Sequence, residues 1–422
     1  MAEESSRDKR QQLSVKHWKD SKGHGTIVAG TGYGKTRVAM NIITKFVELK
    51  PLFRVIIIVP TTVLKDQWEK ELDERQLQLN CQVVVINTAI ENSYSCDLLV
   101  IDEIQRMAAD TFRQVFNVVS YKLILGLTAT FERLDGKHQI LEQYCPVCDN
   151  VPLTECLLNG WVAPYKIYKI LVDVDDIEEY KQYNKEFVQH FEFFSFDWSK
   201  VMSCIGKTGF IARAKLRDEM CPDGSDSERK AVFTQITYHA TGFMRALQKR
   251  KAFINNHVKK IDIARKIIEA RPFSKIITFS NNVKMAESIG MGGKVYTGKV
   301  SKKKGRTTIE EFNQCTTGIL HSCQKCNEGV NIAGLSVGIV LGLDSSELKS
   351  TQRIGRVCRF EPGKQAEMFY IVINDTVECE WCKKALGNQQ YITIDEQGLE
   401  DVLAYKEPQL YKKKIKDFQF RF

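Results

Sequence analysis

Short apolar runs without polar interruption recur along the first 170 residues of this 422-residue chain, and they constrain its fold most strongly. They alternate with longer amphipathic stretches such as "TRVAMNIITKFVEL". The runs occupy residues 26–29, 54–60, 82–86, 97–101 and 122–128. A strand that is apolar at every position is buried on both faces, which is typical of a parallel sheet covered by helices on both sides.

The same pattern returns near the C-terminus, at residues 275–280, 318–322, 337–343 and 367–373. Residues 172–260 differ, because helix-like polar and aromatic segments replace the apolar runs there. Residues 172–198 hold eight Asp/Glu and two Lys, whereas residues 199–260 hold thirteen Lys/Arg against five Asp/Glu. We predict an α/β protein with two parallel-sheet domains in tandem, residues 1–171 and 261–422, and a mostly helical insertion at 172–260 between them.

The composition is that of a soluble globular protein, with 43% hydrophobic and 27% charged residues. The net charge of +9 favours an acidic partner. The N-terminal "MAEESSRDKRQQ" lacks the apolar region of a secretion signal, and no apolar run approaches the length of a membrane span. Thirteen cysteines without an export signal indicate reduced thiols. We expect a cytoplasmic or nuclear protein that is not secreted and has no membrane partner.

The string "VAGTGYGKT" follows the first predicted strand and precedes a helical pattern. Glycines in such a loop let backbone N–H groups point at phosphate oxygens, while Lys35 can reach the β- and γ-phosphates and Thr36 can hold Mg²⁺. Ala29 stands where the strict pattern has glycine. A glycine-rich turn with a surface lysine is the alternative. The predicted nucleotide-binding residues are Ala29, Gly30, Thr31, Gly32, Tyr33, Gly34, Lys35 and Thr36.

Two adjacent acids, Asp102 and Glu103, end the apolar run "DLLVI" in the stretch "DLLVIDEIQRM". Neighbouring carboxylates repel each other unless a metal ion or bound water offsets their charges. Beside a phosphate loop, Asp102 can hold the Mg²⁺ that bridges the phosphates, and Glu103 can orient and deprotonate the attacking water. We therefore expect ATP and Mg²⁺ as cofactors.

The order of motifs resembles that of the superfamily 2 helicases and translocases. The matching strings are "AGTGYGKT", "VPTTVLKDQW" (59–68), "DEIQ" (102–105), "LTATFER" (127–133), "IITFS" (276–280), "NEGVNIAGL" (327–335) and "QRIGRVCR" (352–359), which correspond to motifs I, Ia, II, III, IV, V and VI. "LTATFERLDGKHQIL" followed by "NGWVAPYKI" looks most like the XPB/RecG-like DNA helicases and their phage relatives. The resemblance covers both α/β domains but not the insertion.

The resemblance implies two RecA-like domains with ATP bound between them. It implies that Lys35, Asp102 and Glu103 act on phosphate, metal and water, and that Thr128 and Thr130 couple nucleotide state to nucleic acid. Gln352 would reach the nucleotide from the second domain, with Gly329 of motif V as a further nucleotide contact. Arg356 and Arg359 would act as arginine fingers, because a planar guanidinium neutralises charge on phosphoryl oxygens. A basic surface helix is the alternative for this string.

Three positions qualify the resemblance. Motif II usually ends in His or Asp, but here it ends in Gln105, whose amide can still hydrogen-bond to motif III or VI. Motif V often has Asp where this chain has Asn331, which puts a ribose contact there in doubt. In "RQQLSVKHW", Gln11 or Gln12 lies where the family carries an adenine-reading glutamine, and the spacing to Trp18 slightly favours Gln11. A polar helix start is the alternative.

The implied activity is that of an ATP-dependent DNA helicase or translocase that acts on forked or branched DNA, as in replication, recombination or repair. An RNA helicase is one alternative, and an ATP-switched nucleic-acid clamp without strand separation is another. We expect a monomer that binds nucleic acid through its backbone phosphates. Its affinity should therefore depend little on base sequence and strongly on salt concentration.

The insertion carries the aromatic stretch "FEFFSFDW" and the basic stretches at residues 212–217 and 245–253. Aromatic rings can stack on bases, but clustered phenylalanines are more often the core of a helical unit. The basic stretches and the tail at residues 411–422 are better candidates for nucleic-acid contact.

Three C-x-x-C pairs occur: Cys145/Cys148, Cys323/Cys326 and Cys379/Cys382. Two such pairs can form a tetrahedral zinc site. The separations between these pairs far exceed the usual distance, and one pair falls within motif V. We therefore do not expect zinc.

Overall fold

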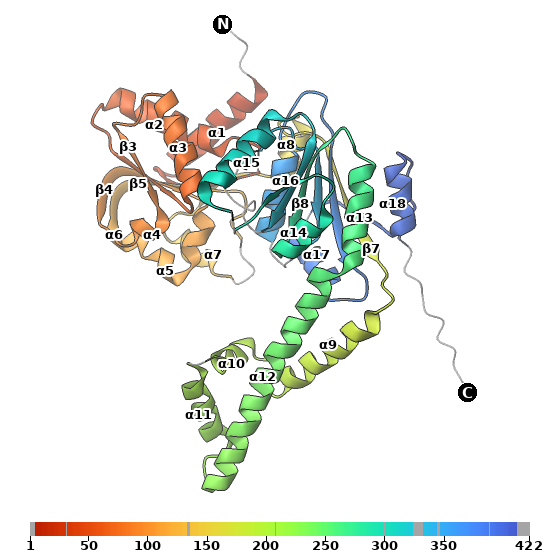
Figure 1. Ribbon diagram of the computed structural model, residues 1–422. Coiled ribbons are helices and arrows are strands. Elements are labelled where there is room, and N and C mark those ends of the chain that lie inside the picture. The colour runs from red at the N-terminus through yellow and green to blue at the C-terminus, as the bar shows by residue number, and fades with distance from the viewer. Residues whose placement is uncertain are drawn as a thin grey trace.

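The computed structural model describes residues 5–30, 32–132, 136–206, 208–298, 300–323, 332–343, 347–387 and 389–411. Two lobes lie side by side, each built on a β-sheet, and a helical arm projects away from them (Figure 1). Every strand pair between the named strands is parallel. This confirms the predicted α/β fold with two parallel sheets.

The first sheet has the strand order β3-β2-β4-β5-β1-β6. Its strands are β1 (His24–Ala29), β2 (Val55–Val59), β3 (Cys81–Val85), β4 (Tyr94–Asp102), β5 (Val119–Thr128) and β6 (Val147–Val151). Side chains along β4 alternate between two separate cores: Leu98 and Val100 face one, Leu99 and Ile101 the other. This alternation explains why the strand is apolar at every position.

Helices cover both faces of this sheet. One face packs against α1 (Ser6–Asp20), α2 (Lys35–Leu49) and α3 (Thr62–Glu74), and α8 (Leu153–Leu158) joins the same core. The other packs against α4 (Ile86–Ala89), the 3₁₀ helix η1 (Ile104–Ala108), α6 (Val115–Val118) and α7 (His138–Glu142), with α5 (Asp110–Arg113) beside η1.

The second sheet has the strand order β13-β7-β12-β11-β8-β10-β9. Its strands are β7 (Tyr165–Val172), β8 (Lys275–Ser280), β9 (Lys294–Tyr296), β10 (Gly318–Cys323), β11 (Val337–Val340), β12 (Ala366–Ile373) and β13 (Ile392–Ile394). One face packs against α13 (Val258–Glu269), α14 (Val283–Ile289) and α18 (Glu396–Leu403). The other contacts α15 (Lys302–Gln314), α16 (Glu347–Val357) and α17 (Glu378–Leu386).

Strand β7 is hydrogen-bonded between β12 and β13, so it belongs to the second sheet. Residues 165–171 fall within the range predicted for the first domain, 1–171, but the last helix of that domain, α8, ends at Leu158. The apolar pattern of β7 is the same in either sheet, so the sequence alone does not reveal its partner strands. Because β7 precedes the arm and α13 follows it, the arm is rooted in the second domain at both ends.

The arm consists of α9 (Ile177–Glu192), α10 (Trp198–Ser203), α11 (Gly209–Met220) and the long α12 (Asp226–Asn256). Helices α9 and α12 lie side by side, and the shorter helices pack beside α12 (Figure 1). The arm has its own small core, which includes Phe194, Val201 and Phe243. Among the helices described, none is both long enough and apolar enough to span a membrane.

A fully buried ion pair links two helices of the second domain next to the point where the arm joins it. Lys260 Nζ of α13 lies 2.5 Å from Glu378 Oε1 of α17, and both side chains are 0% exposed. Lys260 also donates to the Leu341 carbonyl, and Glu378 accepts from the Ile373 N–H. Burial lowers the pKa of Lys260 and raises that of Glu378, while their mutual attraction opposes both shifts. The pair therefore ties two helices to the ends of two strands.

Replacing one partner of this pair is expected to destabilise the protein strongly. Lys260→Met leaves the Glu378 carboxylate buried without its cation, which costs about 3–5 kcal/mol of unfolding free energy. Lys260→Met/Glu378→Leu removes both charges and is expected to be clearly more stable than the single variant. Urea unfolding followed by circular dichroism measures both. Equal destabilisation of the single and double variants would contradict this account.

Candidate nucleotide site between the two domains

The loop that follows β1 has the backbone geometry of a phosphate cradle. Gly32 and Gly34 adopt positive φ values of 90° and 96°, and Gly34 is the residue before the first residue of α2, Lys35. Cβ atoms at these two glycines would lie 2.7 Å from Val162 Cγ1 and from Gln11 Nε2, respectively. Glycine is therefore required at both positions by conformation and by space. Thr31 lies outside the described residues.

Lys35 points back across this loop. Its Nζ donates to the carbonyl of Ala29 at 2.9 Å, and the residue lines the cleft between the domains. Burial lowers the pKa of Lys35, whereas the charges of Glu103 and Asp102 oppose this shift. An ammonium group held this way is positioned to meet a phosphate.

The two acids sit at the end of β4 in different environments. Trp68 Nε1 donates to Asp102 Oδ2 at 3.0 Å, and the Glu103 N–H donates to Asp102 Oδ1 at 3.1 Å. Burial, followed by the Glu103 charge, raises the pKa of Asp102 to about 6. Glu103 has a left-handed backbone with φ 55°, which is uncommon for a residue other than glycine. This turn directs Glu103 into the cleft, which it lines, while Asp102 stays 8% exposed.

Gln105 is almost fully buried and contacts the second acid. Its Nε2 donates to Glu103 Oε2 at 2.5 Å. Thr128 and Thr130 form a local turn at the end of β5, in which Thr128 Oγ1 donates to the Thr130 carbonyl and accepts from the Thr130 N–H. The glutamine that replaces the usual last residue of motif II therefore holds the carboxylate predicted to activate water.

The second domain supplies the opposite wall of the cleft, whose cavity volume is about 470 Å³. Gln352, Arg356 and Arg359 all line it together with Lys35, Thr36 and Glu103. Burial and the neighbouring Arg356 charge lower the pKa of Arg359 to about 10. An ion pair between Asp66 of α3 and Arg306 of α15 also joins the two domains. The structure thus brings motifs I, II and VI together around one cavity.

Helix α1 packs against the phosphate loop. Gln11 Nε2 donates to the Tyr33 carbonyl at 2.8 Å, and Gln11 is 1% exposed, whereas Gln12 is exposed. Of the two glutamines considered from the sequence, Gln11 therefore lies at the loop. Arg7, one turn earlier, donates to the carbonyls of Gly32 and Tyr33 and lines the cleft.

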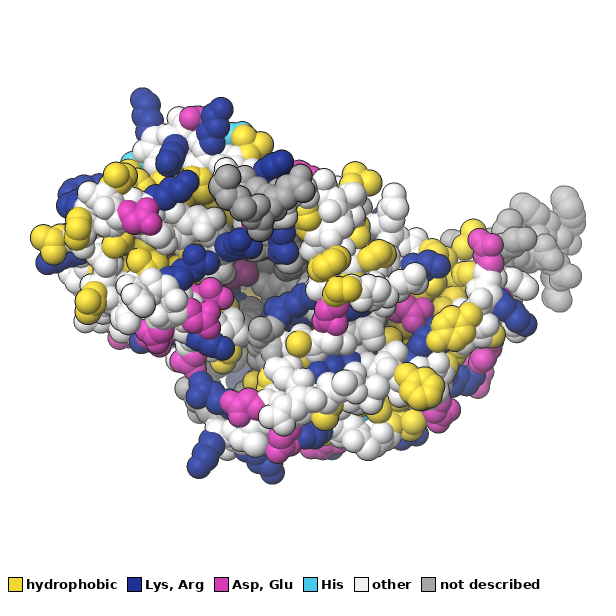
Figure 2. All heavy atoms as spheres, turned by 90° about the horizontal axis from the view of Figure 1, so that it is seen from above, with side chains coloured by type: hydrophobic (Ala, Val, Ile, Leu, Met, Phe, Trp, Pro, Cys, Tyr) yellow, Lys and Arg dark blue, Asp and Glu magenta, His cyan; other side chains and the backbone are white. Residues whose placement is uncertain are grey.

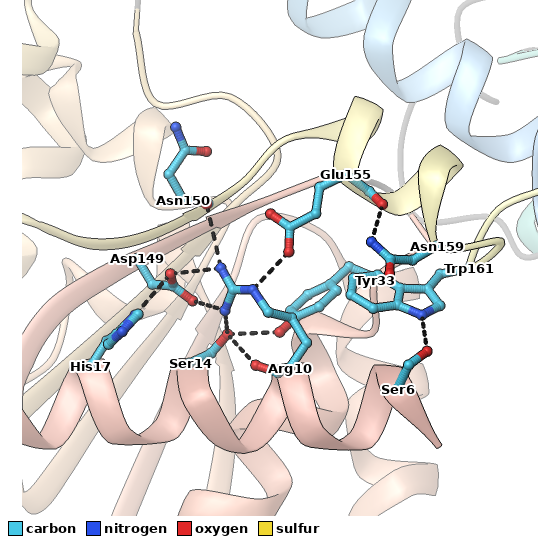
Figure 3. A network of polar contacts seen from close by, with 10 residues as sticks. All are labelled: Ser6, Arg10, Ser14, His17, Tyr33, Asp149, Asn150, Glu155, Asn159 and Trp161. Atoms are coloured by element: carbon cyan, nitrogen blue, oxygen red, sulfur yellow. Dashed lines mark hydrogen bonds and ion pairs between the residues drawn. The ribbon is translucent and has the colours of Figure 1, made fainter.

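A polar network centred on Arg10 fixes α1 to the rest of the first domain (Figure 3). The guanidinium donates to both carboxylate oxygens of Asp149 at 2.8 and 2.9 Å and to Glu155 at 2.8 Å. These contacts raise the pKa of Arg10, with the Asp149 hydrogen bond as the largest cause. Ser14 links the network to the hydroxyl of Tyr33 at 2.7 Å.

Three residues that line the cleft lie outside the seven motif strings: Arg7, Trp161 and Phe360. Phe360 directly follows motif VI and is 53% exposed, and Trp161 precedes the start of β7 by a few residues. Trp161 belongs to the stretch "NGWVAPYKI" that carries part of the resemblance. The position of Arg7 depends on how α1 packs against the phosphate loop.

The residues present fit a nucleotide and its metal ion. The side-chain oxygens of Gln11 and Gln352 are buried and accept no hydrogen bond from any residue that the structure describes, so each is open to a ligand donor. Positive-φ glycines, Lys35 and two arginines suit phosphates, and the oxygens of Thr36 and Asp102 are the hard ligands that Mg²⁺ prefers.

Gly329, Asn331 and Cys326 lie outside the described residues, as does the tail from residue 412 onwards. Cys145 and Cys148 flank the start of β6, whereas Cys379 and Cys382 lie in α17. Within the part of the chain that the structure describes, no three His, Cys, Asp or Glu side chains gather as a candidate metal site.

The aromatic stretch of the arm divides between core and surface. Phe194 is 1% exposed, whereas Phe196 and Trp198 are 55% and 47% exposed. Of the basic residues, Arg250 is buried, and its guanidinium lies 4.0 Å from the ring centre of Phe187. It therefore contributes to the packing of the arm. Lys215, Arg245 and Lys251 are exposed.

Two family sequence models match the chain. The type III restriction enzyme res subunit matches residues 5–95 and 82–133, and the helicase conserved C-terminal domain matches residues 259–361. The matches cover the phosphate loop, both acids, and Gln352, Arg356 and Arg359 of the second domain.

Three relatives are similar over most of this chain. The DNA 3'-5' translocase XPB2 of Sulfurisphaera tokodaii is 25% identical over 87% of this chain and 82% of its own length. A putative ATP-dependent RNA helicase, L396, of Acanthamoeba polyphaga mimivirus is 25% identical over 80% of this chain and 58% of its own. Putative helicase 22 of a Sulfolobus islandicus filamentous virus is 21% identical over 83% and 61%.

Solved structures share the fold. Yeast Dbp5 bound to RNA and ADP BeF3 aligns with a TM-score of 0.59 at 14% identity, over 94% of this chain and 91% of that one. The Hef helicase domain of Pyrococcus furiosus aligns with a TM-score of 0.52 at 18% identity, over 88% and 97%. The family matches and the relatives, together with the site geometry, show that the chain belongs to the superfamily 2 helicases, which are ATP-hydrolysing enzymes, with similarity to XPB-type translocases and viral helicases.

Proposed function

We propose that this protein couples ATP hydrolysis to movement along DNA and to unwinding or remodelling of forked or branched DNA. The observation that carries the proposal is the single cavity lined by Lys35 and Glu103 from one domain and by Arg356 and Arg359 from the other. A site divided in this way is complete only when the domains are closed, so hydrolysis and opening alternate.

In the first domain, the N–H groups of the loop and Lys35 bind the β- and γ-phosphates. Thr36 and Asp102 would hold Mg²⁺, which would offset phosphate charge when bound. Glu103 orients the attacking water and accepts its proton, and Gln105 holds the Glu103 carboxylate through the 2.5 Å contact. Arg356 and Arg359 stabilise the charge that develops on the phosphoryl oxygens.

DNA is proposed because the XPB2 relative, which matches 87% of this chain, is named a DNA translocase. The surface is hollowed between the two lobes, and Lys and Arg side chains gather around this hollow (Figure 2). Exposed Lys215, Arg245 and Lys251 add basic groups on the arm. Such groups hold backbone phosphates without reading sequence.

An RNA helicase remains the second candidate, because the mimivirus relative is named a putative RNA helicase and is equally identical at 25%. The residues of the nucleotide cleft serve either activity. The choice therefore depends on which nucleic acid stimulates hydrolysis.

Lys35→Ala is expected to abolish nucleic-acid-stimulated ATP hydrolysis, with a loss of at least about 10²-fold, because it removes a positioned cation from the phosphates. Lys45→Ala removes an exposed lysine from the same helix and serves as the matched control. A phosphate-release assay measures both variants. If Lys35→Ala keeps stimulated hydrolysis, the site assignment is wrong.

Forked DNA is expected to stimulate hydrolysis more than single-stranded, duplex or RNA substrates of matched sequence, with an affinity that falls steeply as salt rises. ATPase rates across these substrates and four-way DNA, at two salt concentrations, measure the preference. Stronger stimulation by RNA would instead support an RNA helicase. Tight ATP-dependent binding without strand separation on any fork would support a clamp.

Gln105→Ala is expected to spare ATP binding and to lower the amount of strand separation per ATP hydrolysed, because Glu103 loses the amide that holds it. Gln114→Ala, at an exposed glutamine in the same domain, is the control. Parallel ATPase and fork-unwinding assays give the ratio of DNA strands separated to ATP molecules hydrolysed. An unchanged ratio would mean that Gln105 has no coupling role.

A further inference from the structure

The segment Trp161–Ala163, which we call the connector, lies between α8 and β7 and touches both walls of the nucleotide site. Its backbone pairs with motif VI: Val162 forms an antiparallel bridge with Arg359, and the Ala163 N–H donates to the Cys358 carbonyl at 2.9 Å. The backbone position of Arg359 is therefore tied to that of the connector.

The same segment packs directly against the phosphate loop. Val162 is 1% exposed, and the 2.7 Å approach of its Cγ1 to a Cβ built on Gly32 shows that no other group separates them. The Trp161 ring lies 5.9 Å from that of Tyr33, and its Nε1 donates to Ser6 Oγ of α1 at 3.0 Å (Figure 3). Val162 thus lies between the phosphate loop and the motif VI backbone that carries Arg359.

The connector is anchored to the second domain. The Ala366 N–H donates to the Pro164 carbonyl at 2.8 Å, and β7 then pairs along its whole length with β12. On the other side, Gly160 has φ 67° and no atom within 4 Å of where a Cβ would lie, so the chain has room to turn there. The connector therefore joins the two domains: hydrogen bonds from Trp161 to Ser6 and to the Cys156 carbonyl hold its start to the first domain, whereas the contact of Val162 with Gly32 is steric only.

We propose that Val162 is a positioning residue that sets Arg359 against the terminal phosphate by transmitting the position of the phosphate loop. The inference rests on the proposed role of Arg359. A shift of the loop around phosphates presses on Val162, and the paired backbone carries that shift to Arg359. Because packed side chains deform little, a void at Val162 breaks the transmission without removing any group that touches the nucleotide.

Val162→Ala removes two methyl groups from this contact and is expected to lower kcat for stimulated ATP hydrolysis about tenfold or more, with the KM for ATP within about twofold. Affinity for ADP–aluminium fluoride, which mimics the transferred phosphoryl group, is expected to fall about tenfold, while affinity for a non-hydrolysable ATP analogue stays within about twofold. Val162→Ile keeps both branches at Cβ and is expected to retain the activity. If Val162→Ala does not fold, Val162→Leu, whose branch point is at Cγ instead of Cβ, takes its place. The same falls in kcat and in affinity for ADP–aluminium fluoride are then expected, with the KM and the affinity for the ATP analogue little changed.

Val172→Ala is the matched control, because Val172 is equally buried at the far end of β7. It is expected to lower the urea midpoint comparably while kcat and both affinities stay unchanged. The inference is overturned if Val162→Ala folds and leaves kcat and the ratio of the two affinities unchanged, or lowers both affinities equally. Arg359→Ala, measured in parallel, separates the two claims: if it keeps full hydrolysis, the proposed role of Arg359 fails; if it loses hydrolysis while Val162→Ala is normal, only the role of Val162 fails.

Discussion

Burial of like-charged groups beside one another at the nucleotide cleft is the constraint around which the rest of the structure is arranged. Burial and Glu103 raise the pKa of Asp102, while burial and Arg356 lower that of Arg359. Each domain therefore holds charges that are unfavourable by themselves and that a nucleotide triphosphate with its metal ion would offset. The two sheets, the phosphate loop and the motif VI segment bring Glu103, Arg356 and Arg359 to one cavity.

Much of this arrangement was predictable because parallel strands all end at the same edge of a sheet. Lys35 follows β1, Asp102 ends β4 and Thr128 ends β5, so residues that are distant in the sequence come together. Arg359 was assigned through the resemblance, and the structure places it in the same cavity. Arg7 could not be predicted, since its position depends on how α1 packs against the loop, which no local pattern encodes.

The arm shows where sequence patterns lose information. Phe194 and Phe196 are two residues apart in one aromatic stretch, yet the first is buried and the second exposed. Ser195 and Phe196 both have left-handed φ values, 53° and 57°, which turn the chain sharply and separate the two rings. Arg250 likewise belongs to a basic stretch but packs over Phe187, because a long aliphatic stem can bury itself on a ring. Burial at such positions follows from tertiary packing rather than from composition.

Because both β7 and α13 belong to the second domain, both ends of the arm are attached to that one domain. Its longest helix, α12, has 31 residues, and at 1.5 Å per residue it is about 46 Å long. A rotation of the second domain by about 10° about the root of the arm would carry the far end of α12 through about 8 Å, whereas groups in the cleft would move far less. Small changes at the phosphates would in this way become displacements of more than one nucleotide step at the tip.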